Sequence, residues 1–558
     1  MAIVECVPNF SEGRNLAVIN QITQAIENVE GVALLDVDPG AATNRTVVTF
    51  VGDPESAVEA AFAAIKTASE VIDMRNHSGA HARMGATDVC PFIPVSGMTM
   101  EDCAELARKL GERVAKELGI PIYLYEAAAT REERRNLANV RAGEYEGLEQ
   151  KLKDPEWAPD FGEAKFNPGA GATVIGARKF LIAYNVNLNT RDRKRAHDIA
   201  LDIREAGRAK RDAQGEIVRH PDGKAIKVPG RLKETKAVGW YIDEYDQAQV
   251  SINLVDYEVT APHQVFDVIE EEAQKRGLRV TGSELVGLIP LNALLMAGRH
   301  YLKKQGKSMG IPERMIVETA VQSLGLRDIA TFDLDEKIIE YRLNRDNKGL
   351  VDLTVTGFAN ELSTDSPAPG GGSVAALCGS LSASLSSMVG NLTMGRKGQE
   401  SVWEEMSELG AKAQELKDWY LSAVDRDTAA FNAVMAANRI RAKSDDEKAA
   451  KADAVKAANR LATTVPMEVL ERTMELIRLA QKMAEFGNPN SLSDAGVAGL
   501  TARSCAEGAY YNVLINLGGL DDDAAWGKKQ RTKAEANLAK CREKAEALAK
   551  FVERKLSS

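Results

Sequence analysis

The sequence predicts two structural classes in one chain, an α/β first half and an all-helical second half. Up to about residue 330, short apolar runs of strand length alternate with amphipathic stretches of helix length. Beyond about residue 350, long helical stretches follow one another with very few strand signals. A chain of 558 residues also exceeds what one hydrophobic core usually supports, so several domains are expected.

The first third shows the order strand, helix, strand, strand, helix, strand, which is the split βαβ arrangement. The expected strands cover residues 3–7, 33–37, 46–51, 92–95 and 123–125, and the expected helices cover 16–28, 55–72 and 100–118. We assign residues 1–170 to this α/β subdomain.

A second βαββαβ-like subdomain is expected over residues 171–330. Its strands are predicted at 173–175, 181–187, 238–243, 250–255 and 285–289, with helices at 191–206 and 262–276. Glycine-bearing turn signals at 212–216 and 221–224 predict a hairpin excursion within residues 209–235, to which we assign no role. A groove between the two subdomains is the natural place for a ligand.

Residues 331–350 are predicted to be a linker, and residues 351–558 an all-helical domain. Helices are expected at 373–394, 399–440, 447–484, 493–517 and 528–556, which together predict an antiparallel bundle. Residues 366–394 carry no charge and have the spaced small residues of some membrane helices. Their many serines are too polar for lipid, so a packed central helix without a membrane span is expected.

Composition excludes several classes of protein. A net charge of −10 gives no support to nucleic-acid binding. One segment differs, because residues 191–236 carry 14 Lys or Arg against 8 Asp or Glu. This segment is either a solvated surface or a region that attracts an oligoanion. The six cysteines lack paired spacing and the N-terminus lacks a secretory signal, so a cytoplasmic location is expected.

Residues 76–85, Asn-His-Ser-Gly-Ala-His-Ala-Arg-Met-Gly, place His77 and His81 four residues apart. Histidine titrates near neutral pH, so proton transfer is the first hypothesis. A zinc pair would need Glu after the first histidine and a helix to carry both, but Ser78 and Gly79 follow. A purely structural role for both rings is the third interpretation.

Several further motifs accompany this loop. Residues 4–13, 35–38, 43–45 and 88–95, taken with residues 76–85, resemble glutamate formiminotransferase, and residues 367–373 and 511–516 resemble formiminotetrahydrofolate cyclodeaminase. Their order is that of the bifunctional formiminotransferase-cyclodeaminases, and the resemblance covers nearly the whole chain. It implies transfer of a formimino group from formiminoglutamate to tetrahydrofolate, followed by release of ammonia, in a homo-oligomeric enzyme of histidine degradation. The alternative is a monofunctional transferase whose helical domain serves oligomerisation.

For the first site, the resemblance implies that His81 is the catalytic histidine and that Asp38 is a carboxylate of the site. Asp38 could instead be a turn former before Pro39 and Gly40. Arg45 and Arg83 are candidates for binding the carboxylates of the substrate, since guanidinium groups bind carboxylates in a bidentate fork. Either arginine could equally form a surface ion pair.

The resemblance also implies tetrahydrofolate as co-substrate. A polyglutamyl form is expected from the basic segment 191–236, which could hold the tail, and no metal is predicted. A folate-binding loop is implied by the resemblance as well. The loop consists of Gly162, Glu163, Ala164, Lys165, Phe166, Asn167, Pro168, Gly169, Ala170 and Gly171. Ala170 stands where the family has an aromatic residue, which puts ring stacking there in doubt. Ala82 replaces the usual proline after the catalytic histidine.

The second site must work without histidine, because all six histidines lie at or before His300. In residues 416–434 the apolar residues recur at helical spacing, and Asp427 falls on the same stripe while Asp425 faces away. A carboxylate on a packed face is either functional or bonded to a neighbouring helix. The resemblance places the acid–base residue of the cyclodeaminase at Asp427.

Residues 369–373, Pro-Gly-Gly-Gly-Ser, open a predicted helix. The backbone amides of a helix N-terminus attract anions, so a folate carboxylate or pterin oxygen could bind there. Simple close packing is the alternative. The Gly-Lys-Ser/Thr of a nucleotide-binding loop is missing, so ATP is not expected.

Overall fold

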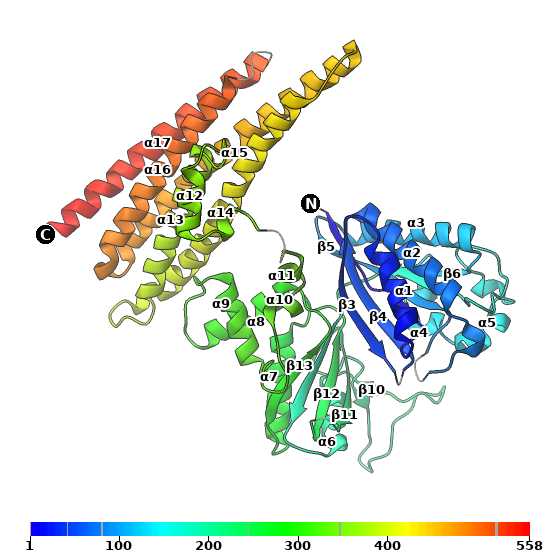
Figure 1. Cartoon of the computed structure of the whole chain (residues 1–558). Coiled ribbons are helices and arrows are strands. Elements are labelled where there is room, and N and C mark those ends of the chain that lie inside the picture. The colour runs from blue at the N-terminus through cyan, green and yellow to red at the C-terminus, as the bar shows by residue number, and fades with distance from the viewer. Residues whose placement is uncertain (1, 42, 80–81, 244, 345–347, 519–522) are drawn as a thin grey trace. The chain divides into compact units, whose positions relative to one another are not determined.

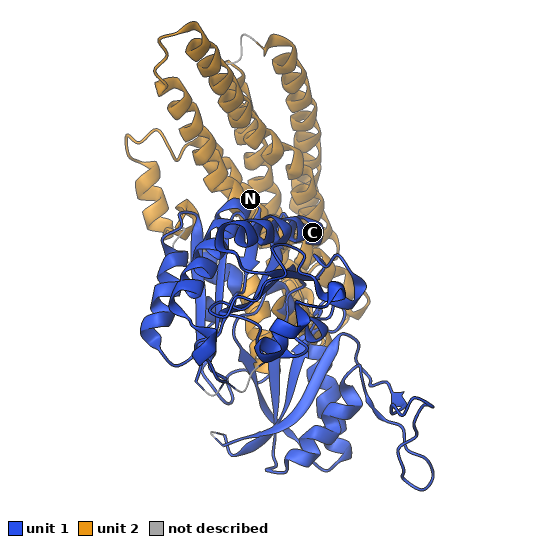
Figure 2. Cartoon of the chain, turned by 90° about the vertical axis from the view of Figure 1, so that its right-hand side faces the viewer, with its two compact units in different colours: residues 1–293, 324–343 blue, residues 294–323, 344–558 orange. Residues whose placement is uncertain are grey.

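The computed structural model describes residues 2–41, 43–79, 82–243, 245–344, 348–518 and 523–558. Helices and sheets alternate in the first half, and the second half is helical (Figure 1), which confirms the predicted α/β plus all-α class. Two compact units are present (Figure 2). Unit 1 contains residues 1–293 and 324–343, and unit 2 contains residues 294–323 and 344–558.

The first sheet of unit 1 has seven strands, β1 (Ile3–Cys6), β2 (Asn9–Phe10), β3 (Val32–Gly40), β4 (Arg45–Gly52), β5 (Thr87–Ser96), β6 (Ile122–Glu126) and β7 (Thr173–Ala177). Strands β1 and β2 both pair with β4 and β5, and β3 pairs with the other edge of β4. Only the pairings of β7 with β5 and β6 are parallel among the described strands of this sheet. Pro8 separates β1 from β2, because proline has no N–H for the ladder.

Helices α1 (Leu16–Glu27), α2 (Pro54–Val71) and α3 (Met100–Leu118) pack on this sheet around one hydrophobic core. Fully buried alanines along α2 let this helix approach its neighbours closely. The short helices α4 (Leu137–Val140) and α5 (Glu144–Lys151) contribute Val140 and Leu148 to a second core cluster with Tyr123 and Val174 of the sheet.

Strand β7 lies in a different sheet from the one expected. The sequence predicts that residues 173–175 open the second subdomain, but β7 is inserted between β5 and β6 of the first sheet. Val174 and Ile175 point to opposite faces and both are fully buried, as in other parallel strands covered on two sides. An apolar run of this kind predicts a strand without specifying its sheet.

The second sheet of unit 1 has the order β11 (Thr235–Ile242), β12 (Gln247–Leu254), β8 (Ile182–Leu188) and β13 (Val280–Val286), with all pairings antiparallel. Helices α6 (Arg193–Ile203) and α7 (Pro262–Lys275) pack against it. Strand β13 lies earlier than the predicted 285–289, because Gly287 adopts a left-handed φ of 78° and ends the strand.

The predicted hairpin excursion is present. Strands β9 (Arg208–Ala209) and β10 (Lys227–Val228) pair antiparallel at its base. Helices α10 (Leu334–Lys337) and α11 (Ile339–Asn344) follow near the end of the first half.

The described residues of unit 2 form helices joined by loops, without strands. It contains α8 (Leu291–Lys304) from residue 294 onward, α9 (Glu313–Ser323), α12 (Val355–Leu362), α13 (Gly371–Thr393), α14 (Trp403–Arg439), α15 (Asp445–Phe486), α16 (Leu492–Leu517) and α17 (Ala524–Leu556). The five long helices from α13 onward agree closely with the predicted ranges. Helices α8 and α9 were not predicted.

Helix α13 is the one described helix that is long and apolar enough to cross a membrane, and most of it is buried inside unit 2. Several of its serine hydroxyls donate to neighbouring carbonyls, whereas the buried hydroxyl of Ser386 has no hydrogen-bond partner among the described residues. Ser382 donates to Ala498 over 2.7 Å, and Ser387 donates to Gly310 over the same distance. Gly379 lies against the ring of buried Tyr420, where a Cβ atom would overlap the ring. These contacts explain how a serine-rich helix packs as a central helix.

Candidate functional site

His77 is held by hydrogen bonds at both ring nitrogens. The Arg83 guanidinium donates to Nδ1 over 3.2 Å, so Nδ1 carries no proton. The Nε2–H of the same ring therefore donates to the carbonyl of Asn44 over 2.9 Å. His77 thus links the histidine loop to the turn between β3 and β4.

Asn44 fastens this turn to two other segments. Its side chain accepts from the N–H of Gly13 over 3.0 Å and donates to the carbonyl of Ser78 over 2.9 Å. The residue has a left-handed φ of 48°, a conformation that asparagine tolerates better than most residues. One buried side chain therefore fixes the start of the histidine loop.

His81, the predicted catalytic histidine, lies outside the described residues. The end of its loop is bonded to the predicted folate loop. Ala86 donates to the carbonyl of Ala170 over 2.8 Å, and Gly85 and Gly171 form an isolated β-bridge. A Cβ atom at either glycine would overlap the backbone of the opposite loop. The structure thus brings the two predicted loops together by close backbone contact.

Within the predicted folate loop, residues 162–165 are exposed, and Ala170 is buried. The methyl group of Ala170 belongs to the core cluster of the first sheet, so this side chain does not offer a stacking surface. Phe166 of this loop forms an aromatic pair with Tyr145, and their ring centroids are 5.6 Å apart. Tyr145 also donates its hydroxyl to the carbonyl of Pro168 over 2.6 Å.

Arg83 is not an exposed receptor for substrate. Its guanidinium is buried and bonds two carboxylates, those of Glu144 over 3.0 Å and Glu146 over 2.5 Å. These partners come from α5, more than sixty positions along the chain. Of the two roles predicted for Arg83, substrate binding and an ion pair, the structure therefore shows the ion pair.

Arg45 lies in a cluster that sequence reasoning missed. Asp88 is 0% exposed, and its carboxylate pairs with Arg45 at 3.4 Å and with Arg141. Arg45 also donates to the side-chain carbonyl of Asn9 over 2.9 Å. Two guanidinium groups share one carboxylate, which leaves an excess positive charge within this trio.

Burial lowers the pKa of Arg45 to about 10, and the neighbouring Arg141 contributes while Asp88 opposes the shift. The arginine remains charged at neutral pH. Asp88 also accepts the N–H of Met84 over 3.0 Å, which places this trio directly after the histidine loop. The one sequence signal for the trio was an acidic residue at the start of the apolar strand β5.

Asp38 is exposed and lies within β3, where it pairs with Val47. The strand continues to Gly40, so Asp38 does not form a turn. Asp36 lies two residues earlier on the same strand. Its pKa is raised by burial and by the charge of Asp38, and Lys337 opposes the shift.

In the helical unit, Asp427 of α14 faces the N-terminus of α13. The hydroxyl of Ser373 lies 3.1 Å from Asp427 Oδ2 and 3.2 Å from the hydroxyl of Thr428. Burial raises the pKa of Asp427, and hydrogen bonds from the hydroxyl and the backbone N–H of Ser373 oppose that rise. The position combines a partly desolvated carboxyl group with donors that hold it in place.

The Asp427 carboxylate itself fills the helix start that could have bound an anion. A Cβ atom at Gly372 would overlap both oxygens of Asp427, so the glycine run lets the two helices meet. Of the two interpretations of residues 369–373, the structure shows close packing around a protein carboxylate.

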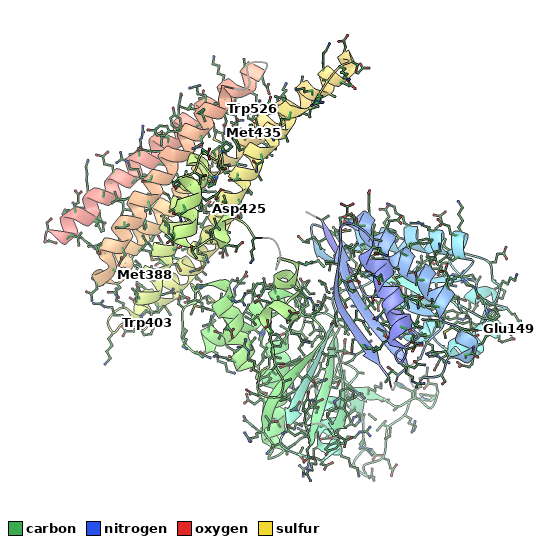
Figure 3. The ribbon with its side chains drawn as sticks, in the orientation of Figure 1. Glu149, Met388, Trp403, Asp425, Met435 and Trp526 are labelled. Atoms are coloured by element: carbon green, nitrogen blue, oxygen red, sulfur yellow. The ribbon has the colours of Figure 1, made fainter. Side chains whose placement is uncertain are left out.

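Asp425 has a different environment. It accepts the backbone N–H of Leu350 over 2.7 Å, and a Cβ atom at Gly349 would overlap its carboxylate. Figure 3 marks Asp425 on α14. This residue anchors the segment that precedes the helical domain.

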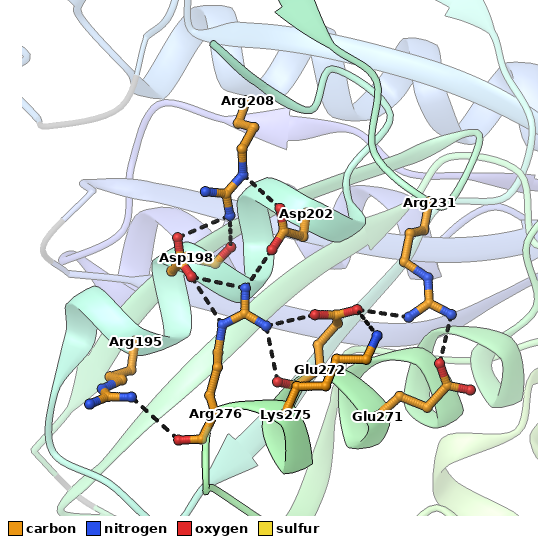
Figure 4. A network of polar contacts seen from close by, with 9 residues as sticks. All are labelled: Arg195, Asp198, Asp202, Arg208, Arg231, Glu271, Glu272, Lys275 and Arg276. Atoms are coloured by element: carbon orange, nitrogen blue, oxygen red, sulfur yellow. Dashed lines mark hydrogen bonds and ion pairs between the residues drawn. The ribbon is translucent and has the colours of Figure 1, made fainter. Parts of the chain in front are cut away.

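The basic segment 191–236 is partly neutralised by its own surroundings (Figure 4). Arg208 pairs with Asp198 over 2.9 Å and with Asp202 over 2.6 Å. Arg231 bonds Glu271 and Glu272 of α7. The arginines that face α6 and α7 therefore stabilise the fold. Among the exposed lysines of the segment, Lys224 forms an ion pair. The others form none with described residues; these are Lys194, Lys210, Lys227, Lys233 and Lys236.

A cavity of about 410 Å³ lies elsewhere in unit 1, and none of the predicted site residues lines it. Its walls include Phe180, Asp256 and Glu340. Among the described residues, no group of three or more His, Cys, Asp or Glu side chains is placed to hold a metal ion.

Family models match three consecutive segments of the chain. The formiminotransferase domain, N-terminal subdomain, matches residues 3–178, the formiminotransferase domain matches 183–344, and formiminotransferase-cyclodeaminase matches 354–537. The α/β half with its paired loops is thus a formiminotransferase domain, and a helical domain with a held carboxylate follows it. The chain belongs to the formiminotransferase-cyclodeaminase family.

Curated relatives support each half. The formimidoyltransferase-cyclodeaminase of Rattus norvegicus is 46% identical over 523 residues, which is 93% of both chains. The glutamate formimidoyltransferase of Streptococcus pyogenes is 46% identical over 301 residues, 54% of this chain and 93% of its own. The methenyltetrahydrofolate cyclohydrolase of Methylorubrum extorquens is 40% identical over 171 residues, 31% of this chain and 82% of its own.

The Asp88 trio makes a prediction about stability. Asp88→Ala leaves two largely buried guanidinium groups without their carboxylate, which should cost about 3–5 kcal/mol of local stability. Native-state hydrogen exchange of the β5 amides in the full chain measures this loss. Asp88→Asn keeps an acceptor for the Met84 N–H and should lose less. A loss below about 1 kcal/mol for Asp88→Ala would contradict the inferred role of the trio.

Proposed function

We propose that this chain is a bifunctional folate enzyme of histidine degradation. Its α/β half transfers the formimino group of N-formimino-L-glutamate to tetrahydrofolate, giving 5-formiminotetrahydrofolate and glutamate. Its helical half then closes this intermediate to 5,10-methenyltetrahydrofolate and releases ammonia. The observation that carries the proposal is the presence of both family segments, in this order, at 46% identity over 93% of the chain.

In the transfer step, the attacking folate nitrogen loses a proton and the leaving glutamate nitrogen gains one. We assign this transfer to His81, because a neutral imidazole accepts and returns a proton near pH 7. His77 is bonded at both nitrogens and has no free lone pair for the same task. The bonded loops at residues 76–85 and 162–171 support a site that combines His81 with the folate loop.

The formimino group is most reactive as an amidinium cation, and exposed Asp38 supplies a carboxylate for it. We assign the binding of the substrate carboxylates to the pair Arg45 and Arg141. These two guanidinium groups share the carboxylate of Asp88, whereas Arg83 bonds the carboxylates of both Glu144 and Glu146.

In the second step, Asp427 is the acid–base group. Deprotonation of a folate nitrogen requires the carboxylate form, and ammonia departure requires a proton donor. A carboxyl group whose pKa is raised by burial serves both roles better than an exposed one.

Polyglutamyl folates are the inferred form of the co-substrate. The exposed lysines of the basic segment, which include Lys194, Lys210 and Lys227, supply positive charge for a polyglutamate tail. Such a tail would keep the intermediate on the enzyme between the two reactions.

We also infer a homo-oligomer. One side of α16 exposes apolar residues at helical spacing, with Ile515 74% exposed, Tyr511 59% and Leu500 55%. A second copy of the chain would cover this stripe. In the monofunctional alternative, covering such surfaces would be the whole role of the helical domain. The free cysteines support a cytoplasmic location.

The finer architecture belongs to the same proposal. Each sheet of unit 1 contains the four strands of a βαββαβ unit. Across the sheet, these strands have the order second, third, first, fourth along the chain, which supports two split βαβ subdomains. The long helices from α13 to α17 are joined by short connections, which supports an antiparallel bundle.

The assay that tests the proposal follows methenyltetrahydrofolate by absorbance, starting from formiminoglutamate and tetrahydrofolate with the purified chain alone. Asp427→Asn should leave formimino transfer intact and lower ammonia release at least about a hundredfold, a typical cost of losing an acid–base group. Asp425→Asn keeps an acceptor for the Leu350 amide and is the matched control. Unchanged ammonia release in Asp427→Asn would refute the assignment.

The pH dependence of ammonia release tests how Asp427 is held. Ser373→Ala removes a hydrogen bond to the carboxylate form, so the pKa of Asp427 should rise further. The acid limb of the rate profile should therefore move to higher pH. Ser373→Thr keeps a hydroxyl and should restore the limb. Ser380→Ala removes a buried hydroxyl from the same helix and should not move it. An unmoved limb in Ser373→Ala would contradict this account.

Monoglutamyl and polyglutamyl substrates test the role of the basic segment. Free 5-formiminotetrahydrofolate should accumulate several-fold more with the monoglutamyl form. Replacing Lys194, Lys210 and Lys227 by Gln should remove this difference, whereas replacing three lysines of α17 should not. Equal release of the intermediate from both substrates would reject retention through the tail.

A further inference from the structure

One face of the second sheet of unit 1 carries a cluster of side-chain amides. Side chains alternate between the two faces along β8 and β12. Tyr184, Val186 and Val250 therefore share one face of the sheet. Asn185 and Gln249 share the other face. Helices α6 and α7 pack against this sheet. A Cβ atom at Gly239 would meet the backbone of His197 in α6, so the neighbouring Trp240 and its partner Gln249 lie on the face away from this helix.

These side chains form a connected hydrogen-bond network. Trp240 donates its indole N–H to Gln249 over 2.8 Å, and Gln249 donates to the side-chain carbonyl of Asn187 over 2.7 Å. Gln249 also lies 3.3 Å from one carboxylate oxygen of Glu284. The network therefore connects the four strands of this sheet, and it ends on the Glu284 carboxylate of β13.

Glu284 is the acceptor at that end. It accepts from the hydroxyl of Tyr245 over 2.8 Å and from the amide of Asn185 over 3.3 Å. In the described part of the chain, no Lys, Arg or His pairs with this carboxylate. Its two amide contacts are longer than ordinary N–H···O bonds, so stronger donors can replace them.

The burial of this network is unusual for a sheet face. Asn187 and Gln249 are both 0% exposed, and Asn185 is 4% exposed. A face built only for packing would be apolar, because buried polar groups must all be satisfied. A sheet face that is simply exposed to solvent would not bury neutral amides. Amides fixed around an uncompensated carboxylate are instead suited to orienting a ligand.

Apolar side chains surround this polar centre. Val238 is 46% exposed, Trp240 is 39% exposed and Val286 is 43% exposed. Their strand pairings place them opposite Ser251, Gln249 and Ala183, on the amide face. The exposed indole, with Val238 two residues away on the same strand, offers a contact surface for a flat ring.

We propose that this face binds the pterin ring of tetrahydrofolate, with Glu284 accepting hydrogen bonds from N3–H and the 2-amino group. A carboxylate accepts two parallel N–H bonds from such an edge as it does from guanidinium. Trp240 contacts the ring, and the network holds Glu284 in position. The assignment rests on the proposed function, since tetrahydrofolate is a substrate there.

The other substrate fits this face poorly. Formiminoglutamate has a cationic formimino group that Glu284 could accept, but it also carries two carboxylates. The network contains no cation to pair with them, and burying an unpaired carboxylate is costly. The neutral, N–H-rich pterin matches both the carboxylate and the apolar rim.

The kinetic test is Glu284→Gln in the full chain. The amide donates towards the pterin amino group in place of accepting from it, so the KM for tetrahydrofolate should rise about tenfold or more, while the KM for formiminoglutamate stays unchanged. Glu270→Gln, on α7 against the opposite face of the same sheet, is the matched control and should change neither value. An unchanged KM for tetrahydrofolate in Glu284→Gln overturns the proposal.

A binding test separates recognition from simple loss of structure. The unaltered chain should bind tetrahydropterin at least about tenfold more tightly than its 2-desamino analogue, and Glu284→Gln should lose that preference. Trp240→Leu, at an exposed position, should weaken tetrahydropterin binding and remove the fluorescence change on binding. An equal preference in both chains overturns the proposal. A wild-type chain that binds tetrahydropterin with this preference but transfers no formimino group overturns the proposed function alone.

Discussion

The transferase half depends on the interactions of the buried carboxylate of Asp88. It accepts the N–H of Met84 at the end of the histidine loop and pairs with Arg45 from β4 and with Arg141 after α4. Three segments distant in the chain are held at one point. An unpaired charge at a fully buried position would be costly, so the two arginines and the carboxylate require each other.

Around that point, backbone contacts determine the rest of the first site. Gly85 and Gly171 meet because neither has a side chain, and this contact joins the histidine loop to the predicted folate loop. Asn44 and His77 hold the other end of the histidine loop by directional hydrogen bonds. The loop is therefore fixed on both sides of His81.

The two halves differ in the groups that surround a buried carboxylate. Asp88 is surrounded by guanidinium groups and serves as a structural anchor. Asp427 has only hydroxyl and N–H donors beside it, so burial raises its pKa. A carboxyl group that is partly desolvated and has no cationic partner retains the ability to exchange a proton. The helical domain, residues 351–558, contains no histidine, and Asp427 is the residue to which we assign its proton transfer.

The sequence by itself determined the two fold classes, the five long helices and the family, because periodicity and loop motifs are local properties of the chain. It also singled out Asp427 from its place on an apolar stripe. Only the tertiary structure decided that β7 joins the first sheet, that Arg83 is occupied by Glu144 and Glu146, and that Asp427 fills the start of α13. The partners of a charge or a strand edge lie far away in sequence, so long-range packing alone selects them.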